Sequence, residues 1–271
     1  MAEYLLDAKG NGQIFAVQKT ICKESSAWQT IEISELELLG RVLALDGIIQ
    51  LSELDKDRYH ETITHPVLQT SLRTPNSSAE ILILGGGDGI IASEVIKYAG
   101  VGVTIVDIDA RVVELCAEHL SDLNNSALTS KSTKVLTMDA LEFTCTAPRE
   151  RYDAIFLDIT DPHPESPSSS LLSSKAIRDY KSLLTPGGVI VCQTDNPFVT
   201  SHHRQQMRKL FGDTFSTVGE FGITALTFAG VFSFVWASDY HQELVFDESM
   251  ITTKWLTAER FEFCKKMLNL A

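Results

Sequence analysis

The chain contains the sequence Ile81-Leu82-Ile83-Leu84-Gly85-Gly86-Gly87-Asp88-Gly89, an apolar run that ends in a glycine-rich turn. The segment after it, 90–98, has the pattern of a helix. A buried strand that ends in a glycine turn and leads into a helix is typical of a nucleotide-binding α/β unit. Asp88 is unusual in such a turn, because the backbone N–H groups are normally left free for an anionic group. The turn therefore predicts an α/β fold whose ligand meets a fixed negative charge.

Segments predicted as strands and as helices alternate along most of the chain. The predicted strands are 81–84, 103–106, 134–138, 154–157, 188–192 and 231–236. The predicted helices lie near 59–72, 89–99, 109–123, 139–146, 172–184 and 199–211. Pro186-Gly187-Gly188 predicts the turn before the fifth strand. This alternation predicts a mostly parallel, doubly wound sheet with its ligands at the carboxyl ends of the strands.

Residues 13–51 have a different pattern, in which apolar and polar positions alternate in short pieces. Asp46-Gly47 separates the apolar runs 41–45 and 48–51, and an Asp-Gly pair between such runs is a strong signal for a β-hairpin. We therefore predict a small antiparallel β-domain over residues 1–56 and an α/β catalytic domain over residues 57–271.

The composition indicates a globular protein with an acidic surface. Its 271 residues carry a formal net charge of −13, which repels nucleic-acid phosphates and attracts a cationic ligand. No segment is long and apolar enough to span a membrane. Glu3 and Asp7 stand where a signal peptide would be basic and then apolar. We expect a cytoplasmic protein that binds neither nucleic acid nor a membrane.

The cysteines and histidines show no spacing typical of a metal site. The five cysteines are scattered, which favours buried, reduced thiols. His202 and His203 are adjacent, so on a helix they would diverge. The sequence predicts no metal.

Acidic residues follow the predicted strands one after another. They are Asp88, Asp107, Asp139, Asp158, Asp161 and Asp195. In an open α/β sheet, positions at the carboxyl ends of the strands face the same crevice. A single member could serve only as a helix N-cap, as the spacing of Asp139 and Glu142 or the position of Asp109 allows. The whole series is harder to explain in that way.

The position of Asp107, about twenty residues after the glycine turn, is where dinucleotide enzymes hold ribose hydroxyls. A dehydrogenase, however, needs Gly-x-Gly-x-x-Gly, and the sixth position here is Ile90. The charge of Asp88 would also oppose a pyrophosphate. The sequence therefore disfavours a dehydrogenase.

With these residues in view, the chain resembles the spermidine synthase family of polyamine aminopropyltransferases from about Phe15 to Trp236. The most specific stretches are Gly40-Arg-Val-Leu-Ala-Leu-Asp-Gly-Ile-Ile-Gln50, Tyr59-His-Glu61, Gly85 to Gly89, Val106-Asp-Ile-Asp109 and Leu157-Asp-Ile-Thr-Asp-Pro162. The resemblance implies a β-domain joined to a methyltransferase-like, Rossmann-type domain, in a homodimer or homotetramer. It also implies a reaction in which the aminopropyl group of decarboxylated S-adenosylmethionine passes to a diamine, typically putrescine. The products are spermidine and methylthioadenosine, and no further cofactor is implied.

The resemblance also implies individual site residues. Those at the donor are Gly85, Gly86, Gly87 and Asp88 in the turn, Gln50 and His60 beside the aminopropyl group, Gln29 and Asp107 at the methylthioribose, and Asp139 and Ala140 at the adenine. Those at the diamine are Tyr59, Asp161 and Asp195.

Elementary chemistry agrees with the assignment of Asp88 and also indicates a general base. The decarboxylated donor keeps an ammonium but has lost its carboxylate, so Asp88 would attract it and repel intact S-adenosylmethionine. The attacking amine must lose a proton before its lone pair can react, because alkylamines are mostly protonated near neutral pH. We therefore expect Asp158 to act as the general base, aided by the Tyr59 hydroxyl.

The departures from the family lie on the acceptor side. Thr227 stands where family members have a tyrosine, and His163-Pro164 replaces a Gly-Pro pair in the loop after Asp161. The tryptophan that often lines the diamine pocket near the N-terminus is absent, and Tyr4 is the nearest candidate. The acceptor therefore stays open, with a longer diamine or agmatine as alternatives to putrescine.

Two other functions also stay open. An amine N-methyltransferase of the same fold would use intact S-adenosylmethionine, although such enzymes lack an acid at the position of Asp88. A homologue that only binds a polyamine or nucleoside would need neither Asp158 nor Tyr59.

Overall fold

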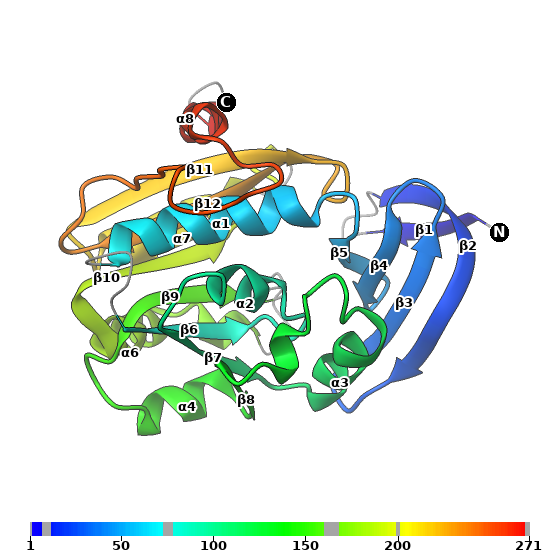
Figure 1. Ribbon diagram of the computed structural model, residues 1–271, viewed down its shortest axis with the longest axis horizontal. Helices are drawn as coiled ribbons and strands as arrows, with labels where there is room; N and C mark the ends of the chain where they lie inside the picture. Colours follow the sequence, from blue (N-terminus) through cyan, green and yellow to red (C-terminus); the bar gives the residue numbers. More distant parts are fainter. Residues whose placement is uncertain (1, 7–11, 73–77, 160–167, 199–200, 269–271) are drawn as a thin grey trace.

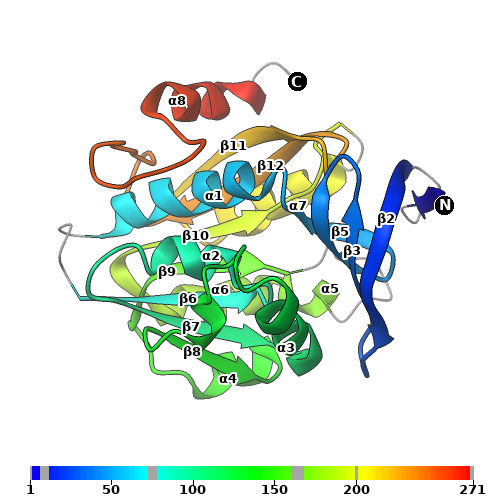
Figure 2. The same ribbon diagram turned by 45° about the vertical axis from the view of Figure 1, so that its right-hand side comes forward.

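The protein has two β-sheets of different size, which lie side by side in the computed structural model (Figure 1). The structure describes residues 2–6, 12–72, 78–159, 168–198 and 201–268. The smaller sheet is formed by the N-terminal part of the chain, drawn in blue, and the rest of the chain builds an α/β unit around the larger sheet (Figures 1 and 2).

The N-terminal sheet has five antiparallel strands in the order β1-β2-β3-β4-β5. They are β1 (Ala2–Leu6), β2 (Gly12–Ser25), β3 (Thr30–Leu36), β4 (Gly40–Leu45) and β5 (Ile48–Ser52). The predicted hairpin at Asp46-Gly47 is confirmed. Both residues have positive φ, 49° and 80°, as a tight two-residue hairpin turn requires. The strand β1 lies outside the predicted range 13–51.

The larger sheet has seven strands in the order β11-β12-β10-β9-β6-β7-β8. They are β6 (Ala79–Gly85), β7 (Val101–Asp107), β8 (Thr133–Thr137), β9 (Tyr152–Asp158), β10 (Leu184–Gln193), β11 (Thr217–Ala225) and β12 (Gly230–Ser238). The strands β6 to β10 pair in parallel, and β11 and β12 are antiparallel. The predicted fold class is confirmed.

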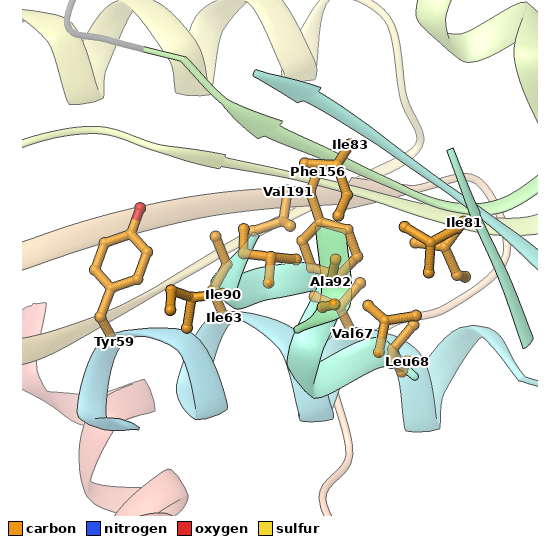
Figure 3. Close-up of a cluster of buried hydrophobic side chains, with 14 of the residues drawn as sticks. Tyr59, Ile63, Val67, Leu68, Ile81, Ile83, Ile90, Ala92, Phe156 and Val191 are labelled. Atoms are coloured by element: carbon orange, nitrogen blue, oxygen red, sulfur yellow. The ribbon is translucent and has the colours of Figure 1, made fainter. Parts of the chain in front are cut away.

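Helices cover both faces of this sheet. They are α1 (Lys56–Ser71), α2 (Ile90–Val95), α3 (Ala110–His119), α4 (Ala140–Thr146), α5 (Ser168–Leu171), α6 (Ser174–Leu183), α7 (Ser201–Gly212) and α8 (Ala258–Met267). Alternate side chains of β6 point to opposite faces of the sheet, because a strand has a two-residue period. Ile81 and Ile83 pack with α1 and α2, as Figure 3 shows, whereas Leu82 and Leu84 pack with α4, α6 and α7.

The bounds of several predicted elements differ from those in the structure. The helix α2 stops at Val95 rather than near residue 99. The short helix α5 had not been predicted. The helix predicted over 172–184 is α6, which begins at Ser174 and ends at Leu183, and β10 already begins at Leu184. Pro186-Gly187-Gly188 therefore lies inside β10, where the pairing with β9 is irregular between Leu184 and Val189. The strand β11 had not been predicted.

The order of the strands reverses between β6 and β9. The chain runs from β6 through β7 to β8 on one side and then returns to place β9 on the other side of β6. In doubly wound sheets, ligands bind at the carboxyl ends of the strands at such a reversal. Gly85 at the end of β6 and Asp158 at the end of β9 are paired across it.

Candidate active site

The glycine turn lies directly against the end of β9. The Gly86 N–H donates to the Asp158 carbonyl oxygen at 3.1 Å. Gly85 has a φ of 82°, and a Cβ there would lie 2.1 Å from the same oxygen. Only glycine fits at this position, because a side chain would collide with the backbone of the neighbouring strand.

The turn is also held by Asp107 and Asn124. One carboxylate oxygen of Asp107, Oδ2, accepts from the Gly87 N–H at 3.0 Å, and a Cβ on Gly87 would lie 2.7 Å from that atom. The buried Asn124 donates from Nδ2 to the Asp88 carbonyl oxygen at 2.9 Å. Asn124 could not be predicted as a site residue, because it is one of several polar residues in the segment 121–126 and forms no recognisable motif. The Asp88 carboxylate accepts from the Ile90 N–H at 2.8 Å, which fixes it at the start of α2.

Three carboxylates gather at this turn, and the pKa values of two of them, Asp158 and Asp107, are raised. Burial, followed by the charge of Asp88, holds the pKa of Asp158 far above its ordinary value. Burial, opposed by hydrogen bonds from the Asp109 and Gly87 N–H groups, raises the pKa of Asp107 to about 6. A cationic ligand would relieve this repulsion, so the cluster of Asp88, Asp107 and Asp158 fits a positively charged group.

Tyr59 brings a hydroxyl from α1 to this cluster. Its ring stands off the helix toward the strands, as Figure 3 shows, and the hydroxyl donates to Asp158 Oδ1 at 3.2 Å. The ring packs against Phe228, Phe232 and Phe234, with centroid distances of 5.7, 5.7 and 5.1 Å. Burial, together with the Asp158 charge, holds the pKa of Tyr59 well above its ordinary value. The phenol therefore stays protonated and acts as a donor to the carboxylate.

The next residue, His60, is buried and has a defined tautomer. Its Nδ1 lies 2.7 Å from the Lys56 carbonyl oxygen, which can only accept, so Nδ1 carries the proton. Burial lowers the pKa of His60, although the Asp88 charge opposes the shift. The neutral ring therefore keeps a lone pair on Nε2. Gln50, Tyr59 and His60 line the same small pocket.

Gln29 contacts Asp109, the residue two positions after Asp107. The Gln29 side chain donates from Nε2 to Asp109 Oδ2 at 3.0 Å, and the Ser26 hydroxyl donates to the same oxygen at 2.6 Å. Asp109 also caps α3 through the Arg111 N–H, the local role that its position in the sequence allowed. It therefore links the N-terminal sheet to the end of β7. This link could not be predicted, because helix capping alone accounts for an aspartate at this position of the sequence.

A wide pocket opens beside this link. It is lined by residues 24–28 of the N-terminal domain, by residues 108–111 after β7 and by Thr137 at the end of β8. Asp139 lies just beyond β8, where its Oδ1 accepts from the Leu141 and Glu142 N–H groups and caps α4. Ala140 is buried behind it. The pocket therefore lies at the carboxyl ends of β7 and β8.

Only some of the residues predicted on the acceptor side lie in the described part of the chain. Asp195 follows β10 with a φ of 59°, and its carbonyl oxygen accepts from the Ser233 hydroxyl at 2.8 Å. Asp161 and the His163-Pro164 pair lie outside the described residues, as does the side chain of Tyr4. Thr227 is buried, and its hydroxyl donates to Asp55 Oδ2 at 3.0 Å.

Glu61 has a different task from its neighbours Tyr59 and His60. It is fully buried, and its carboxylate accepts from the N–H groups of Lys254, Trp255 and Leu256 at 2.6 to 2.8 Å. Glu61 therefore anchors the segment that leads into α8.

Within the described part of the chain, no three His, Cys, Asp or Glu side chains are arranged to hold a metal ion. None of the described helices is long and apolar enough to cross a membrane.

Comparison with protein families gives two matches that together span most of the chain. Residues 56–248 match the model described as the spermine/spermidine synthase domain. Residues 3–53 match the model described as the spermidine synthase tetramerisation domain.

Individual relatives agree with these matches. The chain is 35% identical over 226 residues to a polyamine aminopropyltransferase of Sulfolobus acidocaldarius, which covers 83% of this chain and 73% of the relative. It is 33% identical over 230 residues to the polyamine aminopropyltransferase of Escherichia fergusonii, covering 84% and 77%.

Solved structures share the fold over the whole chain. A spermidine synthase in complex with the transition-state analogue AdoDATO superposes with a TM-score of 0.89 at 23% identity, covering 99% of this chain and 92% of that one. The spermidine synthase from Thermotoga maritima gives a TM-score of 0.88 at 22% identity, covering 100% and 95%. The chain therefore belongs to the spermine/spermidine synthase family, the polyamine aminopropyltransferases, and is a transferase.

Proposed function

We propose that the protein transfers the aminopropyl group of decarboxylated S-adenosylmethionine to a diamine, with putrescine as the first acceptor to test. The observation that carries this proposal is the cluster of Asp88, Asp107 and Asp158 around the glycine turn, with the Tyr59 hydroxyl on Asp158. Membership of the aminopropyltransferase family supports it. The products would be spermidine and methylthioadenosine.

Asp88 is proposed to select the donor. The decarboxylated donor carries a sulfonium and an ammonium, and both positive charges suit a site with three carboxylates. Intact S-adenosylmethionine adds a carboxylate, which Asp88 would repel. The neutral His60 Nε2 and the Gln50 side chain would accept and donate hydrogen bonds beside the aminopropyl group.

Asp158 is proposed to accept the proton of the attacking amine. The amine lone pair forms a bond to the carbon next to the sulfonium, the carbon–sulfur bond breaks, and its electron pair stays on sulfur as a neutral thioether. The nitrogen must shed one proton in the process, and a carboxylate with a raised pKa takes it up more readily than an ordinary one. Tyr59 would orient that carboxylate through its hydrogen bond.

The remaining predicted residues are proposed to hold the two substrates. Gly85, Gly86 and Gly87 let the backbone approach the donor closely. Asp107 would hold the methylthioribose, with Gln29 acting beside it through Asp109. Asp139 and Ala140 would face the adenine, and Asp161 and Asp195 would receive the distal ammonium of the diamine.

The assembly and location of the protein are part of the same proposal. The match of residues 3–53 to a tetramerisation domain supports a homodimer or homotetramer. The cysteines all lie in described segments and none forms a disulfide, which suits a cytoplasmic enzyme. We expect no nucleic-acid partner, because the net charge is −13.

A panel of amines tests the proposal. The protein is incubated with decarboxylated S-adenosylmethionine and, in separate reactions, putrescine, a longer diamine and agmatine, and methylthioadenosine is measured. We expect it to form with at least one of these amines. Its absence with all of them would overturn the proposal.

A further inference from the structure

A closed ring of hydrogen bonds lies next to Tyr59, where β5, the start of α1 and the turn 226–229 meet. The Asp55 N–H donates to Ser52 Oγ at 3.2 Å, and the hydroxyls of Ser52 and Thr227 lie 2.6 Å apart. Thr227 Oγ1 donates to Asp55 Oδ2 at 3.0 Å. Because the carboxylate only accepts, the proton of Thr227 points to Asp55, and Ser52 must donate to Thr227. Every proton in the ring is thereby assigned.

The three side chains of the ring are well shielded from solvent. Ser52, Asp55 and Thr227 are 2%, 5% and 6% exposed. The Thr227 N–H also donates to Asp55 Oδ2, at 2.9 Å, so one carboxylate oxygen holds both the backbone and the side chain of this residue. Buried, fully satisfied networks of this kind fix local geometry.

Asp55 connects this hydrogen-bonded ring to Tyr59. Its carbonyl oxygen accepts from the Tyr59 N–H at 3.1 Å, at the first turn of α1. Its carboxylate holds the residue that precedes Phe228. The Phe228 ring in turn packs against the Tyr59 ring with a centroid distance of 5.7 Å, and against Phe232 at 4.3 Å. One aspartate therefore sets the relative position of two rings that line the same pocket.

The N-terminal sheet also contacts the turn 226–229. Gln13 on β2 donates from Nε2 to the Leu226 carbonyl oxygen at 2.9 Å, and Ser52 is the last residue of β5. The turn itself is closed by the Ala229 N–H, which donates to the Leu226 carbonyl oxygen at 3.2 Å. The turn 226–229 is thus held both by the N-terminal sheet and by Asp55 at the start of α1.

We propose that Thr227, which borders the same pocket, positions the acceptor through the Phe228 ring rather than through its own hydroxyl. The Thr227 hydroxyl is engaged in the hydrogen bonds to Ser52 and Asp55. The pocket wall beside Tyr59 is therefore formed by the apolar ring of Phe228. That wall suits the methylene chain of an aliphatic amine rather than a charged or hydroxylated part of it. This inference rests on the proposed aminopropyl transfer and deepens it on the acceptor side.

The test compares variants of the whole protein in steady-state kinetics with the best amine of the panel. Thr227→Val keeps the shape of the side chain but removes the hydroxyl from the ring. We expect the amine KM to rise about three- to tenfold, the range expected for one lost hydrogen bond. The donor KM should stay within about twofold, and kcat at saturating amine should change little. Phe228→Ala should give the same pattern, and Thr227→Ser should restore wild-type values.

A matched control separates this role from general loss of stability. Ser238 is fully buried on β12, and its hydroxyl donates to the Gly188 carbonyl oxygen at 3.0 Å, at the far end of the strand from the turn. Ser238→Ala should lower Tm without changing the amine KM. An unchanged amine KM in Thr227→Val, or equal changes in the donor and amine KM values, would overturn the inference. If the wild-type protein transfers to no amine, the proposed function itself fails.

Discussion

The Tyr59 hydroxyl donates a hydrogen bond of 3.2 Å to Asp158 Oδ1, although the two residues are 99 positions apart in the chain. Asp158 is fixed to the glycine turn through its backbone, and Tyr59 is fixed through Asp55 at the start of α1. The pair therefore joins the two elements that would hold the donor and the acceptor.

Asp158→Asn should abolish most of the turnover while donor binding is kept. An amide cannot take the proton of the amine, and loss of a general base typically costs about 10²- to 10⁴-fold in rate. Single-turnover kinetics would measure the rate, and the thermal shift caused by the donor would measure binding. Tyr59→Phe keeps the carboxylate and should cost less. Unchanged turnover in Asp158→Asn would remove Asp158 from its assigned role.

The same substitution should stabilise the protein in the absence of ligands. The pKa of Asp158 is higher in the folded protein than the value of about 3.9 expected in the unfolded chain. The folded state therefore binds this proton more tightly, and the stabilisation is lost as the pH rises through the folded pKa. Asn at this position avoids the buried charge, so its gain in Tm should grow with increasing pH and vanish near pH ~4. A Tm difference that does not depend on pH would contradict this explanation.

Asp88→Asn should move the acidic limb of the kcat/KM profile to lower pH. The negative charge of Asp88 favours the protonated form of Asp158, and its removal lets Asp158 ionise at lower pH. The profile of kcat/KM reports groups of the free enzyme, so it is the suitable measurement. Asp139→Asn is the control, because that carboxylate caps α4 and should leave the limb in place. If the apparent pKa of the acidic limb stays the same or rises in Asp88→Asn, a group other than Asp158 controls that limb.

Glu61→Ala should destabilise the protein without a specific effect on the chemistry. Three backbone N–H groups of 254–256 would lose their common acceptor, which by itself would cost about 3 kcal/mol or more. Denaturant unfolding measures this loss, and Glu61→Gln should recover part of it because the amide oxygen can still accept. A loss of turnover at full stability would instead give Glu61 a direct place in the site.

The sequence predicted that acidic residues after successive strands lie together, and the regular sheet does bring Asp88, Asp107 and Asp158 together. Parallel strands bring their carboxyl ends to one edge, so Asp88, Asp107 and Asp158 could be expected together from the sequence alone. Neither the hydrogen bond from Tyr59 to Asp158 nor the Thr227–Asp55 pair follows from such a pattern. Contacts between residues so far apart in the chain depend on how α1 and the turn 226–229 pack.

The missed strand β11 has a local physical reason. Gly219 and Gly222 interrupt its apolar pattern, and glycine weakens any strand signal. In the structure Gly219 lies under the Trp236 ring, where a Cβ would come within 2.3 Å of Nε1. Gly219 therefore weakens the strand pattern in the sequence and, in the structure, leaves space for the Trp236 ring on the paired strand. The domain boundary at residues 56 and 57 stays a prediction.

The most direct test of the central claim is the identity of the group that the protein transfers. The protein is given its best amine together with equal amounts of decarboxylated and intact S-adenosylmethionine, and the amine product is identified by mass spectrometry. Selection of the donor by Asp88 predicts an amine extended by an aminopropyl group, with methylthioadenosine as the second product. A methylated amine, with no aminopropyl product, would contradict the account.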